Sequence, residues 1–379
     1  MTTKILYVSF GNPLTEIGGI EKYLYTLIVN LKSTFSNQIE IFVAFPVFTN
    51  EFGYDCSKEN PLFMPIRIKI PLPRKKFFLP ISKLMFNIYL ANYVHKNGNK
   101  YDILHIHGDN GTLAFKFFKG KKFFSLHGNS AAYYRIIKEK LSPFKRIPLL
   151  IATAVSGFIE TFGVTHSDVS FSDQKEVIEY FKRKTRMNNL VFLSNFVDTN
   201  LFSPCDDRYE VKRKLGLSYD KHYSLWIGTA PLRKRLDLAV QTINESDNFT
   251  LIVIGPEIYF GEKIVNFGFV KDQTLLIDIY RASDIILFTS SHEGQSIALL
   301  ESIATGCVPI IRKSLSIPGF VDGYNCFLVD DDNSFTSTIS SLEKNIELLD
   351  IMSKNVRSLA VELYSVDTGI KNISKFYEL

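Results

Sequence analysis

Two glutamates, Glu293 and Glu301, lie eight positions apart in the stretch Ser291–Ile311, which contains no other glutamate and no Asp, Lys or Arg. A carboxylate can accept hydrogen bonds from paired hydroxyls such as those of a ribose. The pair could therefore hold a ligand. The alternative is that both are solvated surface charges, which is where most glutamates lie.

The predicted elements place the two glutamates at a site for an anion. An apolar strand at 284–290 precedes Glu293, and a helix is expected over about 297–305, with Ser296 as its N-cap. Glu293 then lies in the loop at the carboxyl end of a strand, and Glu301 lies just over a turn into the helix. Backbone N–H groups at a helix start favour a phosphate. A phosphate site beside two carboxylates fits a nucleotide sugar better than a bare nucleotide.

A basic segment, "GTAPLRKRLDL" at Gly228–Leu238, is a second candidate phosphate site. Lys234 could act as a point charge on a leaving diphosphate. Arg233 and Arg235 flank it, and the sequence does not show which of them points the same way. The alternative is an exposed basic turn.

Metal binding is not expected from the remaining polar residues. His105 and His107 alternate at the end of a predicted strand, so they share one face, but no acidic or thiol partner is evident. The Asp-x-Asp within Val329–Asn333 has the composition of a turn. The four cysteines form no CxxC pair, which favours buried free thiols in a reducing compartment.

The length of 379 residues and the order of the predicted elements indicate two domains. Apolar strands alternate with helical stretches, the pattern stops near 195–204 and then restarts, which predicts two parallel, doubly wound sheets. We expect an N-terminal domain at 1–198 and a C-terminal domain at 199–361, with a last helix at about 362–379 packing back on the first. Ligands then bind at the carboxyl ends of the strands, in a cleft where two such sheets face each other.

Composition limits the partners and the location. The formal charge of +5, from 44 basic and 39 acidic residues, does not indicate a nucleic-acid partner. The N-terminus reads as a strand and not as a signal peptide, so we expect a cytoplasmic protein. The segment Ile147–Val164 is at the lower length limit for a membrane span and contains Glu160, and we interpret it as a largely buried helix.

The segment Pro71–Phe86 mixes Arg74, Lys75, Lys76 and Lys83 with bulky apolar residues. Basic residues beside such groups are typical of a membrane interface. We therefore expect a peripheral contact with an anionic membrane on its inner face. The alternative is a helix with a solvated basic edge.

Several motifs together resemble GT-B glycosyltransferases of the family-4 type. The most specific is "EGQSIALLESIATGCVPII…GFVDGYNCFLVD", which carries the family's E-x7-E as Glu293 and Glu301. Further matches, which extend the resemblance over nearly the whole chain, are Gly18–Leu24, Ser194–Pro204, Gly228–Leu238, Asn266–Val270 and Ala282–Asp284. The resemblance implies a GT-B fold with two Rossmann-like domains.

The resemblance also implies residue roles. Glu301 would hold the donor's ribose, Glu293 would contact the transferred sugar and His127 would lie near the reacting carbon. The diphosphate would meet Gly19, Lys234 and the backbone at Gly294, Gln295, Ser296 and Ile297, with Arg233 as the expected replacement for the family's arginine, where this chain has Thr229. Phe196 stands where the family's hinge has Gly, so a different turn is expected there.

The resemblance implies transfer of a sugar, of the hexosyltransferase type, with retention and without a metal ion or other cofactor. The donor would be a nucleotide-diphosphate sugar and the acceptor a hydroxyl of a glycan or lipid-linked molecule. A GT-B nucleotide-sugar epimerase and a catalytically silent nucleotide-sugar-binding subunit remain alternatives. A nicotinamide dehydrogenase is disfavoured, because no G-x-G-x-x-G follows the first strand.

Overall fold

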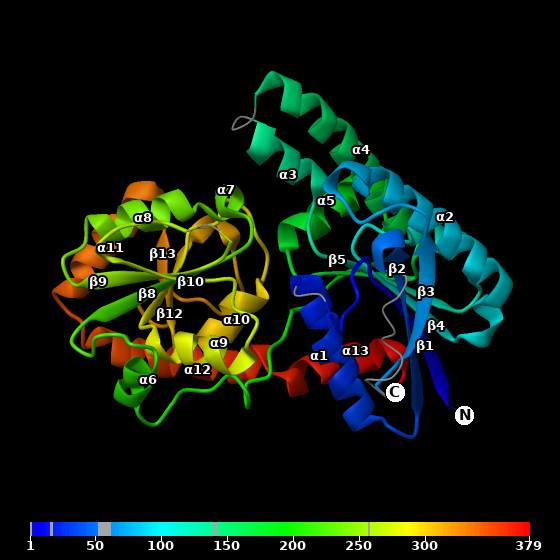
Figure 1. The fold of residues 1–379 in the computed structure, drawn as a ribbon. Coiled ribbons are helices and arrows are strands. Elements are labelled where there is room, and N and C mark those ends of the chain that lie inside the picture. The colour runs from blue at the N-terminus through cyan, green and yellow to red at the C-terminus, as the bar shows by residue number, and fades with distance from the viewer. Residues whose placement is uncertain (1, 16–17, 52–61, 139–141, 257) are drawn as a thin grey trace. The chain divides into compact units, whose positions relative to one another are not determined.

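Strands and helices alternate along the chain in the computed structural model, which describes residues 2–15, 18–51, 62–138, 142–256 and 258–379 (Figure 1). The chain divides into unit 1, Met1–Ser194 with Ile370–Leu379, and unit 2, Asn195–Gly369. The sequence-based boundary after 198 lies close to this division.

Unit 1 is built on a parallel sheet with the strand order β3-β2-β1-β4-β5-β6-β7. Its strands are β1 (Thr3–Val8), β2 (Ile39–Phe48), β3 (Met64–Ile70), β4 (Ile103–His107), β5 (Lys121–Leu126), β6 (Val169–Ser172) and β7 (Leu190–Phe192). β1, β4 and β5 are adjacent, with Tyr7 opposite His105 and His107 opposite Ser125. These central strands are largely buried because both faces of a parallel sheet are covered.

The helices of unit 1 connect these strands. They are α1 (Gly19–Thr34), α2 (Leu79–Asn97), α3 (Ser130–Ile137), α4 (Pro143–His166) and α5 (Lys175–Thr185), with short 3-10 turns at Thr49–Glu51, Lys76–Phe78, Gly98–Lys100 and Thr112–Lys116. One core joins Leu104 and Ile106 of the sheet to Phe86 and Leu90 of α2 and Phe181 of α5.

The interpretation of 147–164 as a largely buried helix is wrong. The helix forms as α4, but only 17% of its most apolar 18-residue window is buried. By length and composition it is the one helix among the described residues that could cross a membrane. Ile159, Glu160 and Val164 are buried against unit 1, whereas the first part of the helix projects beside α3 (Figure 1). An apolar sequence alone does not distinguish a buried helix from an exposed one.

Unit 2 contains a second parallel sheet, of order β10-β9-β8-β11-β12-β13. Its strands are β8 (His222–Ile227), β9 (Phe249–Ile254), β10 (Ile264–Gly268), β11 (Ile285–Phe288), β12 (Val308–Arg312) and β13 (Phe327–Val329). Its helices are α6 (Arg208–Lys214), α7 (Pro231–Lys234), α8 (Leu236–Asn244), α9 (Gln273–Ala282), α10 (Ile297–Ala304), α11 (Asp332–Glu343) and α12 (Leu348–Tyr364), with a 3-10 turn at Lys313–Leu315.

Alternating side chains build a core on each face of this second sheet. Leu225 and Ile286 point into the core that α9, α10 and α12 cover. Their neighbours Trp226 and Ile285 point into the core that α8 and α11 cover. Figure 1 shows these two groups of helices on opposite faces of the sheet. This is the doubly wound arrangement that the sequence predicts.

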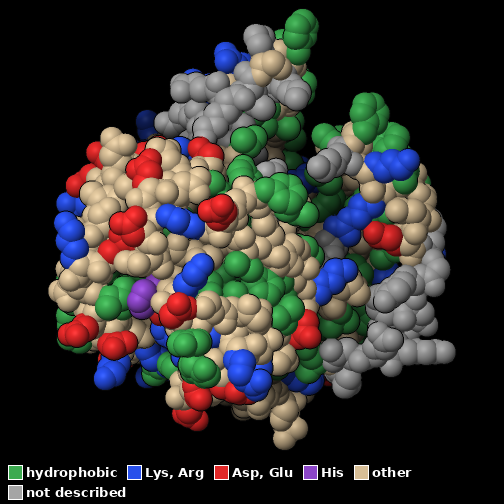
Figure 2. Space-filling view, turned by 60° about the vertical axis from the view of Figure 1, so that its left-hand side comes forward, with side chains coloured by type: hydrophobic (Ala, Val, Ile, Leu, Met, Phe, Trp, Pro, Cys, Tyr) green, Lys and Arg blue, Asp and Glu red, His purple; other side chains and the backbone are tan. Residues whose placement is uncertain are grey.

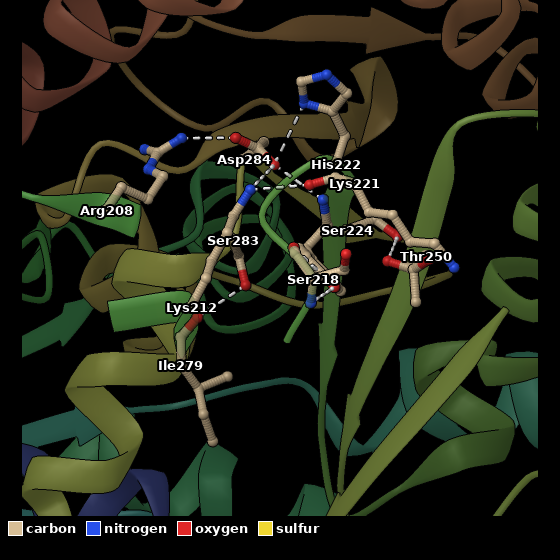
Figure 3. Close-up of polar contacts among 11 residues, drawn as sticks. Arg208, Lys212, Ser218, Lys221, His222, Ser224, Thr250, Ile279, Ser283 and Asp284 are labelled. Carbon is tan, nitrogen blue, oxygen red and sulfur yellow. Dashed lines mark hydrogen bonds and ion pairs between the residues drawn. The ribbon is translucent and has the colours of Figure 1, made fainter. Parts of the chain in front are cut away.

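A buried carboxylate ties together the amino ends of β8 and β11. Asp284 accepts a hydrogen bond from Arg208 at 2.6 Å and one from the Tyr223 backbone at 2.8 Å, and the Lys212 ammonium lies 4.0 Å away (Figure 3). Burial acts to raise the pKa of Asp284, but His222, Arg208 and Lys212 lower it below its usual value. The cluster lies at the amino ends of the strands, whereas ligands of such sheets bind at the carboxyl ends. We therefore assign the cluster a structural role.

The last helix, α13 (Val366–Tyr377), follows α12 after Ser365. Its start belongs to unit 2, where Val197 pairs with Ser365, and its end belongs to unit 1. Tyr377 is buried there and its hydroxyl accepts a hydrogen bond from Tyr7 at 3.0 Å. The sequence predicts a helix at about 362–379 that packs on the first unit, and in the structure Ile370–Leu379 belong to unit 1.

Candidate functional site

The loop between β11 and α10, together with α10 itself, carries most of the predicted donor residues. α10 begins at Ile297 with Ser296 as its N-cap, as expected, but the Ser296 side chain makes no capping hydrogen bond. The first N–H groups of the helix are therefore not used by that hydroxyl. Such groups can bind an anion.

Glu293 lies in this loop beside two cations. Its Oε1 is 3.1 Å from Lys234 Nζ and its Oε2 is 3.5 Å from Arg233 Nη1. The Ser290 hydroxyl donates to Oε2 at 2.6 Å. Burial acts to raise the pKa of Glu293, but Lys234 and Arg233 lower it below its usual value. The carboxylate is thus ionised at neutral pH, and it is not a solvated surface charge, since its side chain is only 13% exposed.

The backbone fixes Lys234 in this position. Its carbonyl accepts hydrogen bonds from Trp226 Nε1 at 3.1 Å and from the Thr289 hydroxyl at 2.6 Å. The side chain crosses Gly228 so closely that a Cβ there would lie 2.2 Å from Lys234 Cδ. The first residue of the "GTAPLRK" motif is therefore a glycine because the lysine needs that space, and an exposed basic turn is excluded for Lys234.

The two flanking arginines point to different partners. Arg233 reaches the loop, where it pairs with Glu293 and donates to the His292 carbonyl at 3.1 Å. Arg235 has a left-handed backbone, with φ at 52°, and pairs with Asp237 at 2.9 Å and with Asp332 at 3.0 Å. The side chains thus diverge, and only Arg233 accompanies Lys234.

Glu301 lies on α10 with a buried carboxylate. The side chain is 2% exposed and accepts a hydrogen bond from the buried Tyr280 hydroxyl at 2.9 Å. Tyr280 lies on α9 and was not singled out from the sequence, since an aromatic residue at a helical spacing reads as core. It holds one carboxylate oxygen in place. Ribose binding by Glu301 stays a prediction.

Gln295 is fixed by the segment that resembles the family's hinge. Its Oε1 accepts from the Asn195 backbone at 3.0 Å, and its carbonyl accepts from Asn195 Nδ2 at 2.7 Å. Gly294 is linked within the loop, because its carbonyl accepts from the Ser296 N–H at 2.9 Å. Phe196 follows with a negative φ and packs against Gly369. The part of the loop next to α10 is thus held by Asn195.

A second group of candidate residues lies in unit 1, at the carboxyl ends of β1, β4 and β5. His127 Nε2 is 3.2 Å from His107 Nδ1, and the His107 ring stacks on His105 with centroids 4.3 Å apart. His105 in turn contacts the Tyr377 hydroxyl at 2.5 Å and the Ser125 hydroxyl at 2.8 Å. Burial lowers the pKa of His127 to about 4 and that of His105 to about 3. The cluster is therefore neutral near pH 7.

The loop that carries His127 is anchored to α4 by Glu160. The Ser130 hydroxyl donates to Glu160 Oε1 at 2.5 Å, and the Ser130 N–H donates to the same oxygen at 3.2 Å. Burial raises the pKa of Glu160 to about 7, with Asp109 adding to the rise. The sequence shows Glu160 only as a charged residue in an apolar helical segment, and it does not predict this contact with Ser130.

Gly19 is the first residue of α1, as the motif predicts, and a Cβ there would meet nothing within 4 Å. Packing therefore does not explain a glycine at this position.

Asp331 of the Asp-x-Asp segment caps α11, and Asp332 pairs with Arg312 and Arg235. Among the described residues, no group of three or more His, Cys, Asp and Glu could hold a metal ion.

Comparison with known proteins agrees with this geometry. Residues 207–359 match the family model described as glycosyl transferases group 1. A curated relative, the Escherichia coli UDP-Gal:alpha-D-GlcNAc-diphosphoundecaprenol alpha-1,3-galactosyltransferase, is 24% identical over 211 residues, which are 49% of this chain and 53% of that protein. The chain thus spans about half the length of that relative.

Solved structures match over the whole chain. The sucrose-phosphate synthase of Thermosynechococcus elongatus has a TM-score of 0.81 at 16% identity and covers 99% of this chain and 98% of its own. The Anabaena protein HepE, solved in complex with UDP and glucose, has a TM-score of 0.72 at 14% identity, with 99% of each chain covered. The GT-B fold that the resemblance implies is confirmed, and the chain is similar to glycosyltransferases.

Proposed function

From this relationship we propose that the chain is a retaining glycosyltransferase that moves a sugar from a nucleotide-diphosphate donor to a hydroxyl acceptor. One observation carries the proposal. Lys234 and Arg233 of α7 form ion pairs with Glu293, which lies in the loop that leads to α10. Two cations and the N–H groups at the start of α10 suit a diphosphate, and a buried carboxylate beside them suits the sugar.

In the proposed reaction, Lys234 and Arg233 stabilise the negative charge that builds on the leaving diphosphate. Groups fixed in advance contribute most to such a step, because they need not reorganise as charge develops. Glu293 and the neutral His127 contact the transferred sugar, Glu301 holds the ribose, and Gly19 faces the diphosphate. As the resemblance implies, we also propose that transfer is metal-independent.

The acceptor in our proposal is a glycan or a lipid-linked sugar. The name of the E. coli relative gives a sugar on diphosphoundecaprenol as its acceptor, and we transfer that class to this chain. We also propose that the protein acts in the cytoplasm, at the inner face of the membrane. Buried free thiols at Cys307 and Cys326 are typical of a reducing compartment.

The test is turnover of a panel of UDP, GDP, ADP and dTDP sugars with the full chain, with and without lipid-linked and soluble glycan acceptors. We expect nucleoside diphosphate release that depends on an acceptor and persists in EDTA, and a product whose anomeric configuration by NMR equals that of the donor. Epimerised donor without acceptor would support the epimerase alternative. Binding by thermal shift with no turnover across the panel would support the silent subunit.

A further inference from the structure

The first part of α4 exposes a continuous apolar face. Its members, called the α4 face, are Phe144, Ile147, Leu150, Ile151, Val155 and Phe158. They recur at intervals of three and four residues, which places them on one side of a helix. Phe144 is 91% exposed and Phe158 is 68% exposed. Large apolar side chains in such a contiguous patch mark an interaction surface.

Between Ile147 and Phe158 the helix carries no charged residue, and the Thr153 hydroxyl has a partner within the helix. The Thr153 hydroxyl donates to the Leu149 carbonyl at 2.8 Å, so it does not need water. A polar group that enters lipid must find such an internal partner.

The helix is too short to span a bilayer in this fold. Its last part is packed into unit 1 through Ile159, Glu160 and Val164. The exposed part, 144–158, is about 22 Å long at 1.5 Å per residue, and the hydrocarbon core of a bilayer is about 30 Å thick. An apolar helix of this length, attached at one end, suits the interface region.

A second surface in unit 1, called the α2 patch, combines apolar and basic residues. It consists of Arg74, Lys75, Phe77, Leu79, Ile81 and Leu84. Phe77 is 83% exposed. α2 and α4 both pack against Thr112–Lys116, and the start of α2 and the α3–α4 hairpin project toward the same side of unit 1 (Figure 1). Figure 2 shows hydrophobic side chains at the outer ends of the projections at the top of the view.

We propose that the α4 face inserts into the interface of an anionic membrane while the basic residues of the α2 patch contact the lipid headgroups. Arg74 pairs with Glu51 at 3.6 Å, whereas Lys75 is exposed at the edge of the patch. The remaining positive charge favours an anionic lipid surface over a second copy of this chain, because two like-charged patches repel. Since α3 begins at Ser130, three residues after His127, docking brings the carboxyl ends of the unit 1 strands near the lipid. This placement suits a lipid-linked acceptor, but the docking does not depend on the proposed transfer.

Co-sedimentation of the full chain with vesicles tests the proposal. We expect the wild type to partition onto phosphatidylcholine vesicles containing phosphatidylglycerol, and Ile151→Ser/Phe158→Ser to partition at least tenfold more weakly. The matched control is Ile351→Ser/Phe260→Ser, which removes a pair of the same residue types from unit 2 that is at least as exposed. Arg74→Gln/Lys75→Gln should lose the preference for anionic over neutral vesicles. Equal partitioning of the α4 and control variants would overturn the proposal.

Two further measurements distinguish insertion of the α4 face into lipid from binding of a second copy of this chain to it. Phe158→Trp should be quenched by lipids brominated in their acyl chains, whereas Phe260→Trp should not. Light scattering without lipid tests for a second copy. A wild-type dimer that Ile151→Ser/Phe158→Ser converts to a monomer would assign the α4 face to self-association and overturn the proposal. Turnover of a water-soluble acceptor should be unchanged in the α4 variant, so the two proposals fail separately.

Discussion

Lys234 Nζ lies 3.1 Å from Glu293 Oε1, and the two side chains are 11% and 13% exposed. The two residues are far apart in the sequence, but they follow β8 and β11, which are neighbours in the sheet. The pair fixes a cation at the carboxyl ends of these strands before any ligand binds. In our proposal the donor diphosphate then meets a charge that is already in place, which is the condition for strong stabilisation of a transition state.

Lys234→Ala should lower kcat more than it raises KM for the donor. The charge matters most as the diphosphate leaves, so its loss acts on the transition state more than on the bound donor. We expect a fall in kcat of about 10²–10³, the usual effect of losing one fixed donor to a developing oxyanion. Steady-state kinetics with donor varied at saturating acceptor measures this. A variant that folds, shown by its circular dichroism, and keeps wild-type kcat would contradict the role.

Arg233→Ala and Arg235→Ala form a matched pair on either side of the lysine. Arg233 pairs with Glu293, so its loss should lower kcat in the same direction as Lys234→Ala. Arg235 pairs with Asp237 and Asp332, so its loss should leave kcat close to wild type. Arg233→Ala/Thr229→Arg should recover part of the lost rate, because it restores the family's arginine. Full kcat in both single variants would show that no arginine serves here.

The sequence predicts which elements carry this site but not the directions of its side chains. The periodicity places Glu293 in a loop after a strand and Glu301 on the following helix, and both placements are confirmed. The choice between Arg233 and Arg235 depends on the left-handed backbone at Arg235, which no pattern in "PLRKRLD" reveals. The exposure of α4 could not be read either, because its apolar residues would serve a core equally well. Partners from distant elements, such as Tyr280 and Tyr377, depend on the tertiary fold alone.

Glu301→Gln should weaken donor binding by about 1.5–3 kcal/mol, the scale of a hydrogen bond to a charged group. Tyr280→Phe is the control, because it removes the hydroxyl that contacts Glu301 Oε2 without changing the carboxylate. We expect this variant to lose less affinity for the donor than Glu301→Gln, because the carboxylate is kept and only its positioning hydroxyl is lost. Calorimetric titration with the nucleoside diphosphate gives both values. If Glu301→Gln folds and binds as tightly as wild type, the ribose assignment is wrong.

Glu160 should make the stability of unit 1 depend on pH. Burial raises its pKa to about 7 in the folded chain, whereas an unfolded glutamate titrates near about 4.3. Between these values the folded state holds a proton that the unfolded state has lost. This group's contribution to stability is therefore fully present below about pH 4 and is lost as pH rises through about 7.

Glu160→Gln removes this dependence and keeps an oxygen that accepts from Ser130. From pH 5 to pH 8, the free energy of unfolding of the variant should therefore rise relative to wild type by about 1–3 kcal/mol. Urea titrations at each pH measure the difference, and Glu176→Gln, at an exposed glutamate of α5, is the matched control. Parallel pH curves for wild type and Glu160→Gln would contradict the prediction.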